Sequence, residues 1–228
     1  MSSSRSLVVD VLIIARNQAP SLAATLAAIP RRNVRSVIVV DNGSSDSTAL
    51  VARDGGAVVL HESRSGKGRA LVRAIAHLEA LPGPPDVVVL MAADGSDDPH
   101  DLPFLLEPIE RDNVELVLGM RQGKPTRTPY ARMVKQMLAA VYRVRFDDVG
   151  PYRAIRFPAL VALSLTDRGD GVDVEMLVKA IKLGLHIAEV PVRPPGRDQA
   201  SGPARKLPRS LSTTGRAIFH IVRHSTTR

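Results

Sequence analysis

Short apolar runs alternate with segments of helical periodicity along the first half of the chain. The apolar runs have the length of buried strands and end in polar or glycine-containing loops. They predict strands at residues 8–14, 34–40, 57–60, 87–91 and 114–118. The segments between them predict helices at 20–28, 45–53, 67–79 and 102–110. Strands that alternate with helices predict an α/β fold, with a mostly parallel sheet covered by helices on both faces.

The second half of the chain is less regular. Helices are predicted at 130–144 and at 172–183, where apolar residues recur at helical spacing, and a strand is predicted at 187–192. A proline- and glycine-rich loop follows at 194–203. The last predicted helix, 207–222, has arginines on one face and four apolar residues on the other: Leu207, Leu211, Ile218 and Val222. We expect one domain at 7–192, with a basic loop and helix at 193–228 packed on it. The alternative is that this helix lies on a membrane surface.

Composition narrows the classes of protein. Of the 228 residues 44% are apolar but only 3% are aromatic, so the core must be built from Val, Leu, Ile and Ala. The absence of cysteine excludes disulfides and thiolate metal sites and fits a reducing compartment. Asp10 interrupts the first apolar run, unlike a signal peptide, and no run reaches the roughly 20 residues of a membrane span. These features predict a cytoplasmic protein, either free or peripheral at the inner face of the membrane.

The positive charge is concentrated near the C-terminus. The net charge is +8, and residues 193–228 hold eight Lys or Arg against one acid, Asp198. A second basic stretch, 116–146, holds seven Lys or Arg and no acid. Such clusters suit phosphates, anionic membranes or nucleic acid, or simply form a solvated surface. The chain has only three Tyr, four Phe and no Trp, few of the stacking residues typical of nucleic-acid binding, which argues against nucleic acid as a partner.

Two polar loops follow predicted strands, at the sheet edge where α/β proteins bind ligands. In the first, Asp41 precedes Asn-Gly-Ser, which suits a tight turn, and its carboxylate could bond a ribose or a base. The second, residues 63–68, reads Ser-Arg-Ser-Gly-Lys-Gly and opens a helix at Lys67. Glycines allow close approach of the backbone, and a helix N-terminus with Lys67 favours an anion. Each loop alone also fits ordinary turn chemistry.

A third loop, residues 94–99, reads Asp-Gly-Ser-Asp-Asp-Pro after the strand at 87–91. Carboxylates that crowd together repel one another unless a cation or hydrogen bonds compensate. Mg²⁺ and Mn²⁺ take oxygen ligands and commonly bridge to substrate phosphates. The loop therefore predicts a divalent-cation site. Asp97 or Asp98 could instead cap the helix that follows Pro99.

Read together, these segments resemble a known family. The ordered series IIARNQ, VIVVDNGSSDST, GKGRAL and VVVLMAADGSDDP, followed by DVGPYRAI and VEMLVKAIKLGLHIAEVPV, is similar to the family 2 glycosyltransferases. It is most similar to the branch that contains dolichyl-phosphate mannosyltransferase and related polyprenyl-phosphate enzymes. The resemblance covers about residues 7–222. It implies a GT-A fold and transfer of a sugar from a UDP- or GDP-sugar to an acceptor, with inversion, and with a polyprenyl phosphate as one candidate acceptor.

The resemblance also implies roles for individual residues. Asp94 is the expected metal ligand and diphosphate contact, with Mg²⁺ or Mn²⁺ as cofactor, and Glu175 is a candidate general base. The expected donor-binding residues lie at the strand ends: Ala15, Asn17, Asp41, Gly43, Ser44, Lys67, Gly68 and Ala93. The residues expected at the acceptor or its phosphate are Tyr152, Arg153, Arg127, Arg132 and Arg197.

The chain departs from the family pattern at three positions. Ala92 replaces the first Asp of the Asp-x-Asp metal motif, and Gln18 stands where an acid is expected near the nucleoside. Asp198-Gln199 stands where polyprenyl-phosphate enzymes often have Ser-Lys. Two hypotheses follow: an inverting glycosyltransferase, or a catalytically impaired domain that binds a nucleotide or a partner protein. An ionised lipid phosphate would need no general base, whereas a hydroxyl acceptor would need Glu175.

Overall fold

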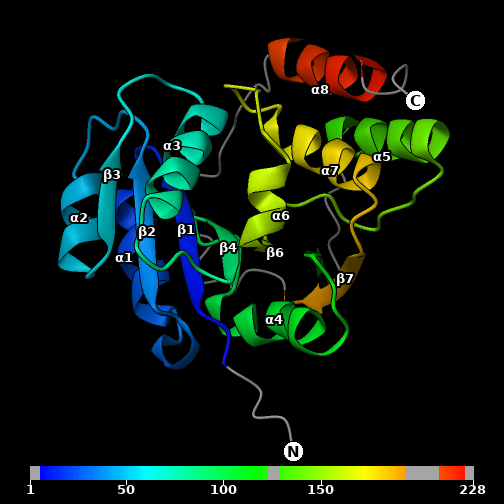
Figure 1. Cartoon of the computed structure of the whole chain (residues 1–228). Helices are drawn as coiled ribbons and strands as arrows, with labels where there is room; N and C mark the ends of the chain where they lie inside the picture. The colour runs from blue at the N-terminus through cyan, green and yellow to red at the C-terminus, as the bar shows by residue number, and fades with distance from the viewer. Residues whose placement is uncertain (1–5, 123–128, 194–210, 224–228) are drawn as a thin grey trace, which may run out of the picture.

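The computed structural model describes residues 6–122, 129–193 and 211–223. A single sheet of seven strands forms the centre of the fold (Figure 1). Its strands follow the order β3-β2-β1-β4-β6-β5-β7 across the sheet. In chain order they are β1 (Val9–Ala15), β2 (Ser36–Asp41), β3 (Val58–His61), β4 (Val87–Ala92), β5 (Leu116–Arg121), β6 (Arg153–Arg156) and β7 (Ile187–Val192).

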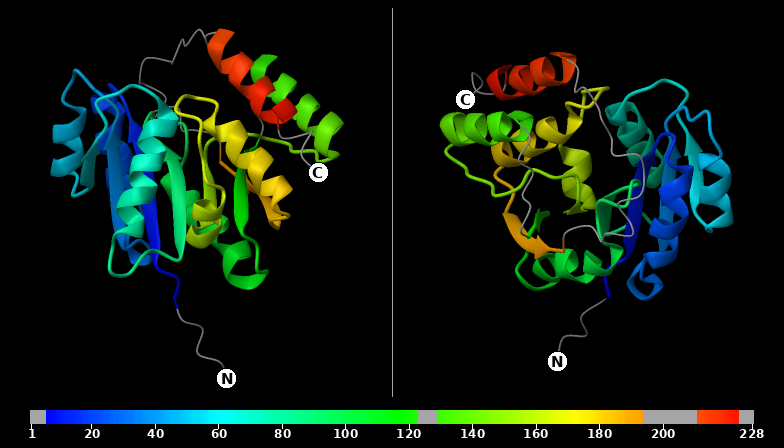
Figure 2. Two further views of the ribbon diagram at one scale, coloured as in Figure 1. Left: turned by 45° about the horizontal axis from the view of Figure 1, so that its top comes forward. Right: turned by 180° about the vertical axis from the view of Figure 1, so that it is seen from behind.

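Helices cover both faces of this sheet, as predicted (Figure 2). They are α1 (Ala19–Ala28), α2 (Thr48–Asp54), α3 (Lys67–Glu79), α4 (Leu102–Arg111), α5 (Pro129–Tyr142), α6 (Phe157–Ala162), α7 (Val172–Lys182) and α8 (Leu211–Arg223). Two short 3-10 helices, Arg31–Asn33 and Pro99–Asp101, complete the described elements. No helix among the described residues is long and apolar enough to cross a membrane.

Alternation along the strands produces two separate cores. In β1, Leu12 faces α3 and α7, whereas Val11 and Ile13 face α1 and α4. Successive strand residues point to opposite faces, so a strand buried on both sides reads as a continuous apolar run. The cores are aliphatic, as composition predicted. Among the charged residues buried with them is Asp10, which is fully buried in β1 and paired with Arg35.

One strand of the sheet was not predicted from the sequence. β6 pairs antiparallel with both β4 and β5, and the other six strands run in one direction. It has only four residues, Arg-Ala-Ile-Arg, and its two arginines hide the apolar pattern of a central strand. The predicted α/β fold with a mostly parallel sheet is confirmed, and the antiparallel strand β6 lies within the sheet between β4 and β5.

The C-terminal helix α8 lies across α5 and α7 (Figure 1). Ala217, His220 and Ile221 are buried there, and the Tyr142 hydroxyl donates to the carbonyl of Ile221 at 3.0 Å. The predicted apolar face was wrong in one respect, because Ile218 and Val222 are exposed rather than packed. The packed face contains Ala217 and Ile221, each one position before the residue predicted to pack. The loop predicted at 194–203 lies outside the described residues.

Candidate functional site

The three polar loops come together at the carboxyl edge of the sheet because of the strand register. Ala15 is aligned with Asp41, and Asp41 in turn with His61. On the other side of β1, Ile14 is aligned with Ala92. The ends of β1, β2, β3 and β4 therefore lie side by side, with their loops extending beyond the same edge. This is where open α/β sheets bind ligands.

The loop after β2 is tied to the loop after β1. Asp41 is buried, and its carboxylate accepts from the backbone N–H of Ser44 at 3.1 Å and lies 3.3 Å from His61 Nδ1. The side chain of Asn17 accepts from the backbone N–H of Ser45 at 2.8 Å, and the Ser44 hydroxyl accepts from that of Asn17 at 3.0 Å. These hydrogen bonds hold the two loops together at the expected nucleoside position. Gly43 forms the turn of the loop after β2, with a φ of +69°.

The glycine loop after β3 is held from two sides. The side chain of Asn42 donates to the carbonyl of Gly66 at 2.8 Å and accepts from its N–H at 3.1 Å. From the other side, the N–H of Gly68 donates to the carbonyl of Gly169 at 3.0 Å. Lys67 extends from this loop to the carboxylate of Asp173, with Nζ–O distances of 2.8 and 2.7 Å. The positive charge of Lys67, which was predicted to contact an anion, is therefore neutralised by the Asp173 carboxylate in this structure.

The carboxylate loop after β4 contains three aspartates in different environments. Asp94 is partly exposed and accepts from the N–H of Ser96 at 3.1 Å. Asp97 is buried and accepts from the N–H of Ala92 at 2.9 Å, and burial raises its pKa to about 6. Asp98 accepts from the N–H of His100 at 3.0 Å and so caps the 3-10 helix after it, one of the two roles considered above. Asp94 is left as the carboxylate available to a ligand.

The carboxylate loop fits a shared cation site rather than a complete one. Among the described residues, no group of three or more His, Cys, Asp or Glu side chains could hold a metal ion. Ala92 provides no carboxylate, and Asp97 has one oxygen bonded to the backbone and the other, Oδ1, buried without a hydrogen-bond partner. Mg²⁺ and Mn²⁺ commonly bind through one or two carboxylates together with substrate phosphates. Asp94 together with a diphosphate would fit this pattern.

Tyr152 and Arg153, expected at the acceptor, are buried beneath the edge. The Tyr152 hydroxyl donates to the carbonyl of Asp98 at 3.1 Å, which fixes the carboxylate loop from below. The guanidinium of Arg153 donates to the carbonyls of Gly150 and Asp173 at 3.0 to 3.2 Å. Both side chains hold loops in place and present no polar group to an open surface. Their expected contact with an acceptor therefore does not match the geometry.

Glu175 is also fully buried, and its carboxylate is saturated with hydrogen bonds. It accepts from the backbone N–H groups of Thr166 and Asp167 and from the Thr166 hydroxyl at 2.7 to 3.1 Å, and pairs with Lys179 at 2.9 Å. Burial opposes ionisation, but bonds from Thr166 and Lys179 outweigh it and lower the pKa to about 2. A carboxylate with such a pKa is a poor proton acceptor near neutral pH. The geometry favours a positioning role over the general base considered above.

The remaining expected acceptor residues are distributed differently. Arg132 is exposed on α5, while Arg127 and Arg197 lie outside the described residues. The structure instead brings Arg121 to the edge, at the end of β5, with Nε 3.6 Å from the buried carboxylate of Asp148. The apolar pattern predicts a strand that ends at residue 118, so the sequence indicated Arg121 only as part of the basic stretch 116–146. The signal was present, since a strand extended to 121 places Arg121 at the same edge as the carboxylates.

Comparisons with known proteins agree with this architecture. The chain is 34% identical over 207 residues to an uncharacterised glycosyltransferase of Mycobacterium tuberculosis, covering 86% of this chain and 91% of the relative. It is 32% identical over 233 residues to the undecaprenyl-phosphate mannosyltransferase of Micrococcus luteus, covering 91% and 89%.

A solved structure shares the fold. Glucosyl-3-phosphoglycerate synthase from Mycobacterium tuberculosis, in complex with Mn²⁺, UDP-glucose and phosphoglyceric acid, superimposes with a TM-score of 0.78 at 22% identity, over 97% of this chain and 81% of that one. The model of glycosyl transferase family 2 matches residues 10–163. The chain therefore belongs to glycosyl transferase family 2 and is a transferase.

Proposed function

We propose that this chain transfers a sugar, with inversion, from a UDP- or GDP-sugar to a phosphate-bearing acceptor, and that a polyprenyl phosphate is the first acceptor to test. The observation that carries the proposal is that two cations, Lys67 and Arg121, lie near the carboxylate loop. Burial dominates the pKa of Asp97, but Lys67 and Arg121 both lie near enough to lower it. A diphosphate leaving group and an acceptor phosphate would both need such cations.

The proposed reaction is one displacement. A phosphate oxygen of the acceptor attacks the anomeric carbon in line, and the bond from that carbon to the diphosphate oxygen breaks as the nucleoside diphosphate leaves. Lys67 and Arg121 hold the phosphates, and Asp94 would hold a divalent cation next to the diphosphate. When bound, that cation offsets the negative charge of the leaving group. An ionised phosphate needs no general base, which agrees with the engaged carboxylate of Glu175.

Two relatives support a phosphate-bearing acceptor. Undecaprenyl-phosphate mannosyltransferase and glucosyl-3-phosphoglycerate synthase are both named for compounds that carry a phosphate. For a lipid acceptor, α8 offers a peripheral membrane contact, because Ile218, Phe219 and Val222 are 39 to 52% exposed on its outer side. Apolar side chains on one side of a surface helix can enter the boundary of a bilayer.

The decisive experiment is a transfer assay by mass spectrometry. UDP- and GDP-sugars are combined with undecaprenyl phosphate, 3-phosphoglycerate or glycerol, with and without Mn²⁺. Product is expected with a phosphate-bearing acceptor and not with glycerol. Nucleotide binding without transfer to any acceptor would favour the alternative, a catalytically impaired nucleotide-binding domain, which the loss of a carboxylate at Ala92 motivates.

The role of Asp94 is tested by the variant Asp94→Asn. A charge-assisted contact contributes about 1.5–3 kcal/mol, so Mn²⁺-dependent affinity for the nucleotide should fall by about 10- to 100-fold. Asp54→Asn, at an exposed position on α2, is the matched control and should bind normally. If Asp94→Asn keeps its Mn²⁺-dependent affinity, Asp94 does not share the cation.

A further inference from the structure

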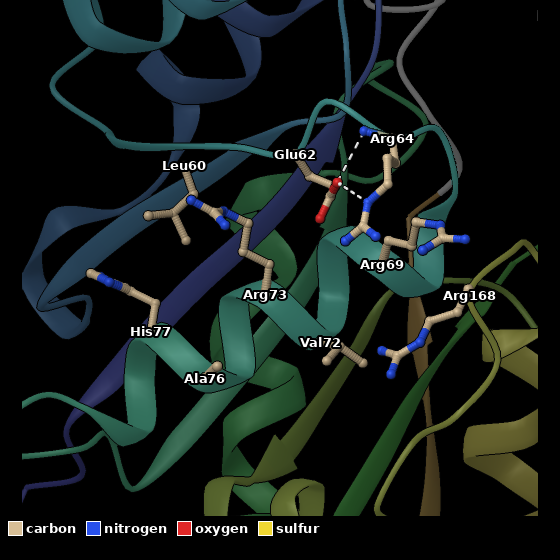
Figure 3. A pocket seen from close by; sticks show the side chains of 9 residues that line it. All are labelled: Leu60, Glu62, Arg64, Arg69, Val72, Arg73, Ala76, His77 and Arg168. Atoms are coloured by element: carbon tan, nitrogen blue, oxygen red, sulfur yellow. Dashed lines mark hydrogen bonds and ion pairs between the residues drawn. The ribbon is translucent and has the colours of Figure 1, made fainter.

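An open groove of about 600 Å³ runs along the outer flank of α3, beside the edge strand β3 (Figure 3). It lies outside the carboxylate loop and contains none of the residues assigned above to the donor. Its apolar lining comes from Leu60, Val72 and Ala76. Its polar lining is Glu62, Arg64, Arg69, Arg73, His77 and Arg168. The volume is within the roughly 300–1,000 Å³ of small-molecule sites.

The lining carries a strong excess of positive charge. Four arginines face one carboxylate, that of Glu62, which gives the groove a net charge of +3 with His77 neutral. That carboxylate already accepts from the backbone N–H of Arg64 at 2.9 Å and lies 3.4 Å from its Nε. Within the described ranges, no hydrogen bond or ion pair engages the side chain of Arg69, Arg73 or Arg168. No described carboxylate forms an ion pair with these three guanidinium groups, and Glu62, already bonded to Arg64, only partly offsets the charge of Arg73.

Tertiary structure gathers these arginines from separate segments. Arg64 belongs to the loop after β3, Arg69 and Arg73 lie one turn apart on α3, and Arg168 comes from the loop before α7. Like charges at i and i+4 on a helix are mutually destabilising, and a third guanidinium across the groove adds to the repulsion. An anion between them would offset this repulsion. Figure 3 shows Arg64, Arg69 and Arg168 gathered at one end of the groove, with the side chain of Arg73 pointing toward Leu60 farther along it.

We propose that this groove is a second ligand site, distinct from the donor site, and that it binds a phosphate-bearing anion. Guanidinium groups match the geometry of phosphate through paired N–H···O bonds and remain charged at all physiological pH values. Nucleic acid is disfavoured because the lining contains no Phe, Tyr or Trp on which a base could stack.

Occupation of the groove would also tighten the contact beneath it. The backbone N–H of Arg69 donates to the carbonyls of Gly66 and Arg168 at 3.1 and 3.3 Å, which joins the glycine loop to the loop before α7. A ligand held by Arg69 and Arg168 together would resist separation of these segments. Binding should therefore raise the midpoint of thermal unfolding, by an amount that grows with the logarithm of ligand concentration.

The test measures binding of inorganic pyrophosphate to the whole protein by calorimetry. Wild type is compared with Arg73→Gln/Arg168→Gln and with Arg32→Gln/Arg145→Gln, whose arginines are exposed elsewhere and whose loss changes net charge equally. The donor site is weakened as a competitor by repeating the series in a Lys67→Gln/Arg121→Gln background, because these two cations are the proposed phosphate contacts of that site. Removing two guanidinium contacts should weaken affinity by about 10-fold or more, and the control pair by less than about threefold.

A vesicle arm identifies the source of the phosphate. Co-sedimentation with phosphatidylglycerol vesicles, against phosphatidylcholine, is measured for the same variants. If only vesicle binding depends on Arg73 and Arg168, the ligand is a lipid headgroup. If pyrophosphate binding depends on them, it is a soluble anion. Equal losses in the groove and control pairs, or no binding by wild type to either probe, would overturn the proposal. Circular dichroism of each variant confirms folding.

Discussion

Gly68, the second residue of α3, provides the sharpest test of how the donor loop is held. A Cβ at this position would lie 1.9 Å from the carbonyl oxygen of Asp167 and 2.8 Å from its carbon, whereas ordinary contact begins near 3.4 Å. Both of the atoms that it would meet belong to the backbone, so no side-chain rotation relieves the overlap. In Gly68→Ala the two loops must therefore separate by more than 1 Å.

The size of the effect follows from these contacts. Forcing a methyl group into a packed site costs about 1–3 kcal/mol. Separation also breaks the 3.0 Å bond from the N–H of Gly68 to the carbonyl of Gly169, a loss of about 1 kcal/mol. The total, about 2–4 kcal/mol, is a large share of a stability that is typically about 5–15 kcal/mol. We expect a lower unfolding midpoint or, if the loops part locally, a weaker affinity for the donor.

Thermal unfolding and nucleotide titration measure both outcomes. Gly83→Ala is the matched control, because a Cβ there meets no atom within 4 Å and its φ is not positive. It should unfold and bind like the wild type. An unfolding midpoint and a nucleotide affinity for Gly68→Ala that both equal those of Gly83→Ala would refute the reasoning, since the backbone contact would then have no energetic consequence.

Two further predictions concern buried charges. The pKa of Glu175, about 2 against an ordinary 4.5, means that the fold favours its ionised form, by on the order of 3 kcal/mol. This stability is present above pH 4.5 and is lost as the pH falls toward 2, so Glu175→Gln should be less stable than wild type at pH 7 and the difference should shrink on acidification. An acid titration of both proteins in which the difference stays constant would contradict the assignment. Arg35→Met removes the partner of the fully buried Asp10, bonded at 3.0 and 2.5 Å, and should cost about 2–4 kcal/mol in urea unfolding, discounted because Arg35 is 37% exposed. The double variant Asp10→Val/Arg35→Met should recover most of this loss, and a double variant as unstable as Arg35→Met would show that the loss has another cause.

The sequence alone determined the α/β architecture and the position of the polar loops. A strand with a continuous apolar run, such as β4, was recognisable because burial on both faces favours apolar residues throughout. Loops at the ends of such strands necessarily share one edge. The grouping of Asp41, Lys67 and Asp94 at that edge was therefore predictable from local pattern and chain order.

Tertiary structure decided what each charged side chain does. The sequence could not show whether Glu175 is exposed or enclosed by the loop at 166–167. The position of a residue in a helix determines the direction of its side chain, but not which segment packs against it. β6 lacks a period of its own and is held by strands on both sides. The arginines of the groove lie up to about a hundred residues apart, and only the packing of α3 against the loop before α7 brings them together. Periodicity and burial are local properties that sequence records, whereas the pairing of charges depends on contacts between distant segments.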